Sequence, residues 1–350
     1  MASDHTVVVS KRLVPSHAAL TDAREVKHYW SALLALWGIH GRRATASSTF
    51  FPGCNPRSIS RNLASRLGAR RYHICLKSDG VRYVLFLTTR MGDPKRGVAL
   101  MIDRSRKMYE VEVAAPEEHF LRGTVLEGEL VWRQPDEREM IYYVFDAVVV
   151  AGEAIGAKPF EARLAMATAL TRLSSDLRHE TDARILEARA VVLCQFDPRV
   201  DMKPKTFVDR RFAARLWGER NDVEHRVDGV ILQCMDAPYT VGTAEDGSAF
   251  KWKEHSTVDL RGVPPDLHAA EAPLPSRLSG RAVVLGTSRV AATREDDVVE
   301  YHVEVTDAEV RLVPVRARPD KTSANGLRVV EATVEDVIHA ITPDDLAAAV

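Results

Sequence analysis

The stretch from residue 72 to residue 150 constrains the fold most, because short apolar runs alternate there with turn residues. The first two runs, 72–76 and 81–87, are rich in β-branched and aromatic side chains, which favour strands. Between them, Asp79 and Gly80 form a pair that is typical of a turn, because glycine tolerates positive φ and aspartate can bond its own backbone. The pattern therefore predicts a β-sheet whose first two strands are separated by a turn.

Lys77 opens this turn and is a candidate for covalent catalysis. A lysine amine becomes a nucleophile when it loses its proton, whereas the guanidinium of arginine does not. Only 11 of the 48 basic residues are lysines, so a retained lysine indicates a need that arginine does not meet. Four of them recur in the segments described below: Lys77, Lys251, Lys253 and Lys321. The alternative is an ordinary surface turn that carries these residues by chance.

Length and composition bound the class of protein. With 350 residues and 45% hydrophobic content, the chain is long enough for two domains with normal cores. The net charge of −1 excludes a chain that is basic throughout, so any contact with nucleic acid must come from local patches. There is no apolar run of about 18 residues and no signal-peptide core, so neither a membrane span nor secretion is expected. The four scattered cysteines favour a reducing compartment without structural zinc.

Acidic residues recur beside the predicted strands. Glu127 and Glu129 lie two residues apart on one strand, so both side chains face the same side. Such a pair is suited to binding a metal ion or ribose hydroxyls or to general base catalysis, and an edge strand facing water is the alternative. Phe145 and Asp146 end the next run and place an aromatic face beside an acid, although a core position is the alternative for Phe145. Asp228 stands directly before a further apolar run.

Basic residues form three groups. Lys251 and Lys253 share one face of a predicted strand with Trp252 on the other face, and their like charges repel unless an anion or water screens them. A second group, at 318–321, follows the last β segment. The third group is a run of arginines at 57–71 without any acid, which indicates either a phosphate-binding surface or a solvated helix face.

The order and spacing of these segments strongly resemble the GTP:RNA guanylyltransferase (mRNA capping enzyme) branch of the lysyl nucleotidyltransferases. Six segments match the family's motifs in order: 77–82 (K-x-D-G-x-R), 127–129 (D/E-G-E), 143–146, 228–231, 250–253 and 318–321 (R-x-D-K). Two further segments, 51–59 and 257–259, look like the F-P-G lead-in and the T-V-D sequence of capping enzymes. The departures are Ser78, Glu127 and Ala324, and none of them removes a reacting group.

The resemblance implies an α+β fold. It consists of a nucleotidyltransferase domain with ATP-grasp-like, antiparallel sheets and a C-terminal OB-fold domain. We expect the first domain to span 1–254 with a helical lead-in at 1–50, and the OB-fold domain to span 255–332. A C-terminal helix at 333–350, with Thr333 as its N-cap, is expected to dock back on the first domain.

The resemblance also implies a mechanism in two steps. Lys77 attacks the α-phosphate of GTP, releases pyrophosphate and carries GMP as a lysyl-N-GMP adduct. The 5′-diphosphate end of RNA then attacks the adduct and forms the GpppN cap. The residues implied to bind GTP are Arg82, Glu129, Phe145, Lys251, Lys253, Arg318 and Lys321. The ligands implied for Mg²⁺ or Mn²⁺ are Asp228, Glu129 and Asp146, and the supporting motif residues are Asp79, Gly80 and Asp320.

Each of these residues has an implied task. Arg82 and Glu129 are expected at the ribose hydroxyls, and Phe145 is expected to stack on guanine. The lysines at 251 and 253 are expected to hold the α-phosphate and, by charge repulsion, to favour the neutral amine of Lys77. The cations at 318 and 321 would orient the leaving pyrophosphate, which requires closure of the cleft.

Two other functions remain open at this stage. An ATP-dependent DNA or RNA ligase shares the nucleophile chemistry, and an inactive scaffold that binds RNA or polymerase tails belongs to a different class. No phosphatase signature and no spare length for a methyltransferase are evident, so separate RNA triphosphatase and cap methyltransferase proteins are expected, with the RNA polymerase II tail as a further partner. The expected location is the nucleus, or a viral factory or virion if the source is viral.

Overall fold

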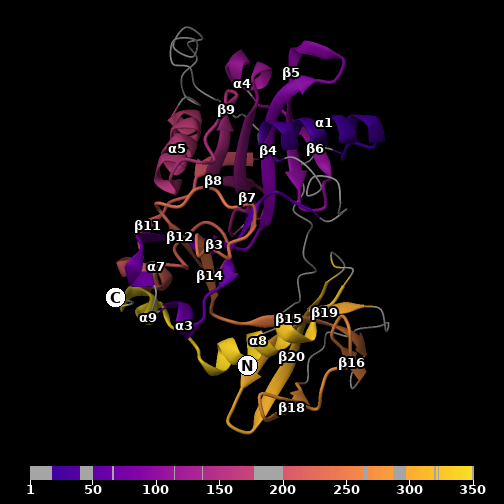
Figure 1. Cartoon of the computed structure of the whole chain (residues 1–350), viewed down its shortest axis with the longest axis vertical. Coiled ribbons are helices and arrows are strands. Elements are labelled where there is room, and N and C mark those ends of the chain that lie inside the picture. The colour runs from indigo at the N-terminus through magenta and orange to yellow at the C-terminus, as the bar shows by residue number, and fades with distance from the viewer. Residues whose placement is uncertain are drawn as a thin grey trace. The chain divides into compact units, whose positions relative to one another are not determined.

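The computed structural model describes residues 18–39, 50–64, 67–113, 115–135, 137–176, 200–263, 266–286, 297–318, 321 and 323–348. It divides into two compact units (Figure 1). The first unit consists of the described part of Leu13–Ser58 together with Leu67–Trp252, and the second consists of Ile59–Arg66 and Lys253–Val350. Within the described ranges, no helix is long and apolar enough to cross a membrane.

The largest sheet of the first unit has seven strands in the order β10-β8-β7-β4-β5-β6, with β9 paired to β8. Its strands are β4 (Val81–Arg90), β5 (Asp93–Asp103), β6 (Met108–Val111), β7 (Thr124–Trp132), β8 (Met140–Val150), β9 (Glu153–Ala154) and β10 (Val200–Pro204). All neighbouring pairs except β8 and β10 run antiparallel. The mixture of mainly antiparallel sheets and separate helices confirms the predicted α+β class.

Helices cover both faces of this sheet (Figure 1). Because side chains alternate along a strand, Val84 and Phe86 of β4 face one side and Tyr83 and Leu85 face the other. The first face packs against α1 (Ala23–Leu36), and the second packs against α5 (Phe160–Asp176). The helix α1 lies within the predicted lead-in, whose residues 1–17 and 40–49 are outside the described residues.

The second sheet of this unit has five strands in the order β11-β3-β12-β14-β2. Its strands are β2 (Arg57–Ser58), β3 (Tyr72–Ser78), β11 (Val208–Asp209), β12 (Val227–Cys234) and β14 (Ala249–Lys253). The smaller elements of the unit are β1 (Cys54–Asn55), which pairs with β13 (Gly242–Thr243), and the helices η1 (Leu67–Ala69), α4 (Glu117–Leu121), η3 (Arg210–Phe212) and α7 (Ala213–Gly218). Both predicted strands around Lys77 are therefore present, but β3 and β4 belong to different sheets.

Gly80 marks the point where the chain passes from one sheet to the other. A Cβ at this position would lie 2.3 Å from the carbonyl oxygen of Leu130 and 2.7 Å from a methyl group of Val131. Gly80 is absent from the glycines with positive φ in the described part of the chain. The glycine is thus required by the close approach of β7, and the turn conformation expected from the sequence is not the reason.

The second unit contains a six-stranded sheet in the order β16-β15-β19-β20-β18-β17. Its strands are β15 (Thr257–Val263), β16 (Asp266–His268), β17 (Arg277–Leu278), β18 (Arg281–Leu285), β19 (Val298–Val305) and β20 (Glu309–Ala317), and its helices are α3 (Arg61–Ala64), α8 (Leu327–Ile338) and α9 (Pro343–Ala348). The helix α8 packs Val330 and Val334 against Leu260 and Val303 of the sheet. The OB-fold assignment and the limits of the domains stay predictions.

The C-terminal segment differs from the single helix expected at 333–350. It forms α8 and α9, and α8 begins at Leu327 with Gly326 as its N-cap. Thr333 lies inside α8, where its hydroxyl donates to the carbonyl of Val329 at 2.8 Å. The helix starts earlier because Val330 and Val334, one turn apart, both reach the core of the second unit.

Gly128 of β7 provides a test of the packing in the first unit. A Cβ there would lie 2.5 Å from the ring of Tyr142 and 2.7 Å from the carbonyl oxygen of Tyr143. We expect Gly128→Ala to lower the free energy of unfolding by about 1–3 kcal/mol, because a buried ring and a backbone group must both move. Urea unfolding followed by tryptophan fluorescence measures this, since all five tryptophans lie in the first unit.

Gly218→Ala is the matched control for this experiment. Gly218 ends α7, and a Cβ at this position meets nothing within 4 Å. An unfolding midpoint that drops equally in both variants would contradict the packing argument.

Candidate functional site

Lys77 lies at the end of β3, beside Asp228 of β12. Its Nζ donates to Oδ1 of Asp228 at 2.7 Å. In the pairing of the two strands, Gly229 is opposite Lys77 and Val227 is opposite Ser78, so Asp228 is the extra residue of a β-bulge. A bulge changes the direction of a side chain, and here it brings the carboxylate to the lysine. About a quarter of each side chain is exposed, 24% for the lysine and 28% for the aspartate, so solvent or a ligand can reach both.

Ser78 connects Lys77 to a buried polar network that the sequence did not predict. Lys205 donates to the hydroxyl oxygen of Ser78 at 2.5 Å, and this oxygen lies 2.9 Å from Nε2 of His225. Ser78 therefore accepts from Lys205 and shares a second hydrogen bond with His225, whose direction depends on the tautomer of the imidazole. Lys205 also lies 4.8 Å from the centre of the Tyr143 ring. The scarcity of lysines was the signal that could have identified Lys205.

Burial controls the charges in this network. Burial and the nearby positive charge of Lys205 lower the pKa of His225 to about 4, so the imidazole is neutral at neutral pH. Burial also lowers the pKa of Lys205. Within the described residues, Nδ1 of His225 is buried without a hydrogen-bond partner. Burial thus disfavours the charged form of both basic side chains in this network.

Glu129 lies on β7 and is half-buried near Lys77. Burial raises the pKa of its carboxyl group, and the opposing effect comes from nearby cations, of which Lys77 is the strongest. In the strand pairing, Glu129 is opposite Arg82 of β4. The structure thus brings together Lys77, Asp228 and Glu129, three of the residues that the resemblance implied.

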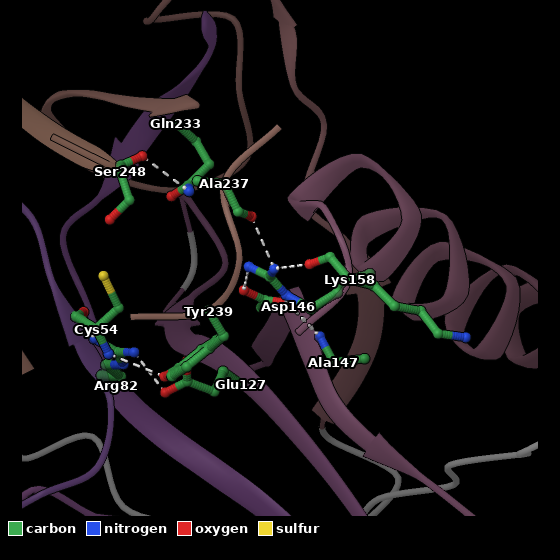
Figure 2. Close-up of polar contacts among 11 residues, drawn as sticks. Cys54, Arg82, Glu127, Asp146, Ala147, Lys158, Gln233, Ala237, Tyr239 and Ser248 are labelled. Carbon is green, nitrogen blue, oxygen red and sulfur yellow. Dashed lines mark hydrogen bonds and ion pairs between the residues drawn. The ribbon is translucent and has the colours of Figure 1, made fainter. Parts of the chain in front are cut away.

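Arg82 is held by Glu127 rather than by Glu129 (Figure 2). Its Nη2 donates to Oε1 of Glu127 at 2.5 Å, and its Nη1 donates to the carbonyl of Cys54. Glu127 is fully buried, and its second oxygen accepts from the hydroxyl of Tyr239. The two glutamates predicted to act as a pair therefore have different roles, because Glu127 satisfies a buried arginine and Glu129 faces the lysine.

Phe145 and Phe51 both lie against the guanidinium group of Arg82. The guanidinium carbon is 5.3 Å from the ring centre of Phe145 and 5.9 Å from that of Phe51. Gly53 permits this arrangement, because a Cβ there would lie 2.6 Å from Nη2 of Arg82. Phe145 is half-buried, so part of its ring is accessible to a planar ligand.

Asp146 does not join the predicted metal ligands in this structure. Its two carboxylate oxygens accept from Nε and Nη2 of Arg163 at 2.9 and 3.0 Å, and both side chains are buried. Burial raises the pKa of Asp146 to about 6, against the effect of Arg163, so the pair is ionised at neutral pH. The sequence could not reveal this partner, because Arg163 comes from the helix α5.

The remaining predicted cations lie on β14 and in the second unit. Lys251 and Lys253 share a face of β14, and the ring of Trp252 lies edge-on to Trp217 at 5.0 Å. In the second unit, Arg318 and Lys321 both donate to Asp259, the arginine at 3.1 Å. Asp320 lies outside the described residues.

The arginine run at 57–71 is occupied by contacts within the protein. Arg66 is outside the described residues, and the other four bond acidic side chains or backbone carbonyls: Arg57, Arg61, Arg70 and Arg71. These contacts favour a structural role over the phosphate-binding surface that the sequence left open.

A divalent cation would find two suitable carboxylates here and not three. Where side chains are described, no three His, Cys, Asp or Glu residues gather to form a metal site. Asp228 and Glu129 are hard oxygen ligands near Lys77, whereas Asp146 is occupied by Arg163. Such a pair fits Mg²⁺ or Mn²⁺ only if substrate phosphates and water supply most of the other ligands, as is usual for Mg²⁺.

His225 generates a prediction about stability and pH. Its folded-state pKa lies below the unfolded value, so the unfolded chain binds more protons between about pH 4 and 6.5, and stability is lost as the pH falls through this window. From pH 7 to pH 5 we expect this residue to cost about 1–2 kcal/mol. His225→Gln keeps a hydrogen-bond partner for Ser78 but has no titrating ring, so it should show a smaller loss.

Urea unfolding of both proteins at pH 7 and pH 5, followed by tryptophan fluorescence, measures this difference. The other histidines of the chain serve as the internal control, because both proteins contain them. Equal losses of stability in the two proteins would contradict the assignment of a neutral, buried His225.

Several known proteins are similar to this chain. The mRNA-capping enzyme subunit alpha of Yarrowia lipolytica is 24% identical over 336 residues, which cover 85% of this chain and 81% of the relative. The Neurospora crassa protein of the same name is 28% identical over 232 residues, covering 61% of this chain and 54% of the relative. The mRNA-capping enzyme of Caenorhabditis elegans is 25% identical over 328 residues, which cover 83% of this chain and 47% of the relative. The chain thus spans about half the length of the last two relatives.

Similar solved structures include two DNA ligases. Mycobacterial DNA ligase D complexed with ATP and MES has 15% identity and a TM-score of 0.41, with coverage of 79% of this chain and 97% of the ligase. Chlorella virus DNA ligase-adenylate has 14% identity and a TM-score of 0.37, with coverage of 76% and 100%. At these TM-scores the likeness carries no argument about function.

The family model described as "mRNA capping enzyme, catalytic domain" matches residues 15–255. This match covers well over half of the 350 residues. It includes β3, β4, β7, β8, β12 and β14, the strands that carry the site around Lys77. The resemblance predicted from the motifs is confirmed, and the chain belongs to the mRNA capping enzyme family of nucleotidyltransferases.

Proposed function

We propose that this chain transfers GMP from GTP to the 5′-diphosphate end of RNA through a covalent adduct on Lys77. Family membership makes it a nucleotidyltransferase with GTP and RNA as substrates. The observation that carries the proposal is the position of Lys77 at the junction of two sheets, paired with Asp228 and near Glu129. Arg82 on β4 and Phe145 on β8 flank β7 in the same sheet, and the guanidinium group lies against the ring, so a nucleoside can be bound there.

In the first step, the neutral amine of Lys77 attacks the α-phosphorus of GTP. A P–N bond forms, the bond from this phosphorus to the oxygen that bridges it to the β-phosphorus breaks, pyrophosphate leaves with the electron pair, and the nitrogen of Lys77 releases a proton to solvent. In the second step, a terminal oxygen of the RNA diphosphate attacks the same phosphorus, the P–N bond breaks, and Lys77 takes up a proton. Lys77 is therefore a covalent catalyst that is regenerated in each cycle.

The ion pair with Asp228 gives this mechanism a point of control. It holds the amine in place in the resting site, because Nζ of Lys77 donates to the carboxylate of Asp228. A divalent cation on Asp228 would compete with Lys77 for this carboxylate. Asp228 and Glu129 would hold Mg²⁺ or Mn²⁺ together with the nucleotide, and the ion would supply charge that stabilises the phosphates during transfer.

The part of the site proposed to bind the nucleoside combines the aromatic ring of Phe145 with the guanidinium group of Arg82. Phe145 can stack on guanine with the accessible part of its ring, as the resemblance implied. Nε of Arg82 is buried and has no hydrogen-bond partner within the described residues, so a nucleoside hydroxyl could accept from it once the side chains that cover it move aside. Glu129, half-buried and opposite Arg82, can accept from such a hydroxyl. On β14, Lys251 and Lys253 would hold the α-phosphate.

The expected partners follow from the reaction. The acceptor carries a 5′-diphosphate, so a reaction that removes one phosphate from triphosphate RNA must precede it, and a cap methyltransferase would act on the product. We propose that separate proteins supply both activities, that the site of action is the nucleus, and that the RNA polymerase II tail is a further partner.

Covalent labelling tests the proposal directly. We expect wild-type protein to form a labelled adduct with α-phosphate-labelled GTP and not with α-phosphate-labelled ATP, in a reaction that requires a divalent cation. Lys77→Arg keeps the charge beside Asp228 but has no nucleophilic amine, so labelling should fall below detection. Gel autoradiography measures the adduct.

Lys95→Arg is the matched control, because Lys95 is an exposed lysine of β5 away from the site. Labelling with ATP instead of GTP would favour an ATP-dependent ligase. If Lys77→Arg were still labelled, Lys77 would not be the nucleophile.

Lys321 generates a prediction about the two half-reactions. If it orients pyrophosphate, it must exchange Asp259 for phosphate oxygens, and it should matter only while pyrophosphate is present. We expect Lys321→Ala to slow adduct formation from GTP by about 10–100-fold and to leave the attack of RNA on preformed adduct within about twofold of wild type. Rapid-quench assays of each step measure the two rates.

Arg311→Ala controls for the loss of a cation in the second unit, because Arg311 pairs with Glu309 on β20. Equal losses in both half-reactions of Lys321→Ala would argue against a role confined to pyrophosphate.

A further inference from the structure

Tyr239 closes a ring of hydrogen bonds around Arg82. Its hydroxyl donates to Oε2 of Glu127 and accepts from the backbone N–H of Cys54 at 2.9 Å. These same two residues accept from Arg82, Glu127 through its Oε1 and Cys54 through its carbonyl oxygen. In Figure 2, the side chains of Tyr239, Glu127 and Arg82 point toward one another. One hydroxyl therefore contacts both residues that hold the arginine.

The position of this hydroxyl is determined by its own surroundings. The ring of Tyr239 lies edge-on to Trp37 at 5.6 Å, and the guanidinium carbon of Arg163 lies 5.5 Å from its centre. Its backbone N–H donates to the carbonyl of Gly156 at 2.7 Å. Arg163 is in turn held by both oxygens of Asp146. The hydroxyl is thus presented by a ring with contacts on several sides and not by a mobile side chain.

Glu127 needs this contact to keep one orientation. The last torsion of a glutamate has broad minima, so a single bond from Oε1 to Arg82 leaves the carboxylate able to rotate. The second bond, from Tyr239 to Oε2, removes this freedom. Burial raises the pKa of Tyr239 well above its usual value, so the phenol stays protonated and remains a donor.

The consequence reaches the nucleoside side of the site. With Nη1 and Nη2 of Arg82 bound to Cys54 and Glu127, Nε is the donor without a partner among the described residues. The same guanidinium group lies against the ring of Phe145. A shift of Glu127 would therefore move the guanidinium group of Arg82. This group carries the Nε–H donor and also lies against the ring of Phe145, to which we assign the nucleoside.

We propose that Tyr239 is a positioning residue for GTP binding, which acts through Glu127 and Cys54 to hold Arg82 in the orientation that meets the nucleoside. This inference rests on the proposed function, because it assigns a task to a residue that touches no reacting atom. It predicts that the loss of the hydroxyl weakens nucleotide binding and leaves the chemical step at Lys77 unchanged, since Lys77 pairs with Asp228 on another strand.

Tyr239→Phe tests the inference because it removes the hydroxyl and keeps the ring. We expect the KM for GTP in adduct formation to rise about tenfold, with the maximal rate within about twofold of wild type, as expected when binding in the ground state is lost. Initial rates of labelling over a range of GTP concentrations measure both quantities. A lower maximal rate at unchanged KM would overturn the inference.

Tyr142→Phe is the matched control for lost stability. Tyr142 is a buried tyrosine of β8 whose hydroxyl donates to the carbonyl of Tyr83 at 3.0 Å, so its removal also deletes one buried hydrogen bond of the first unit. We expect a similar fall in thermal stability in both variants and an increased KM only in Tyr239→Phe. An equal rise of KM in Tyr142→Phe would make the effect merely structural and overturn the inference.

Glu127→Gln tests the route through which Tyr239 acts. If both residues act on Arg82 as one unit, the KM of the double variant should equal that of the more affected single variant, and the two effects should not multiply. Multiplied effects would show that Tyr239 does not act through Glu127. Failure of the wild type to label with GTP overturns the proposed function together with the inference, whereas a labelling wild type with an unchanged KM in Tyr239→Phe overturns the inference alone.

Discussion

The passage of the chain from one sheet to the other at Gly80 is the constraint on which the site depends. Lys77 lies near the end of β3 in the five-stranded sheet, and Arg82 lies near the start of β4 in the seven-stranded sheet. A Cβ on Gly80 would collide with β7, so the segment that joins the two sheets passes directly against the backbone of β7 at this point. Lys77, which we propose reacts with the phosphate, and Arg82, which we propose meets the nucleoside, therefore lie close together along the chain although they belong to different sheets.

Buried ion pairs determine which acidic residues are occupied within the protein and which lie near Lys77. Glu127 and Asp146 are neighbours across β7 and β8, and two unpaired carboxylates so close would repel each other in the low-dielectric interior. Each is neutralised by its own arginine, Arg82 for Glu127 and Arg163 for Asp146. Because Asp146 is paired with Arg163, the acids that lie near Lys77 are Asp228 and Glu129.

The sequence predicted the local elements well and the partners of individual side chains poorly. Apolar runs rich in β-branched residues identified β3, β4, β7 and β8. The partner of Asp146 could not be predicted, because it comes from a helix that the strand pattern does not place. The start of α8 was missed because a threonine at 333 resembles an N-cap, whereas the burial of Val330 extends the helix to Leu327.

By itself, the sequence determined the family, the strand-rich organisation and the identity of the candidate nucleophile, because these depend on residue types in a local order. Only the tertiary structure decided which acid meets which cation, that β3 and β4 join different sheets, and that Tyr239 closes the contacts around Arg82. The physical reason is that strand periodicity tells which side chains share a face but not which strands become neighbours. The bond from Tyr239 to Glu127 joins residues 112 positions apart, and the pair of Lys77 and Asp228 joins residues 151 positions apart.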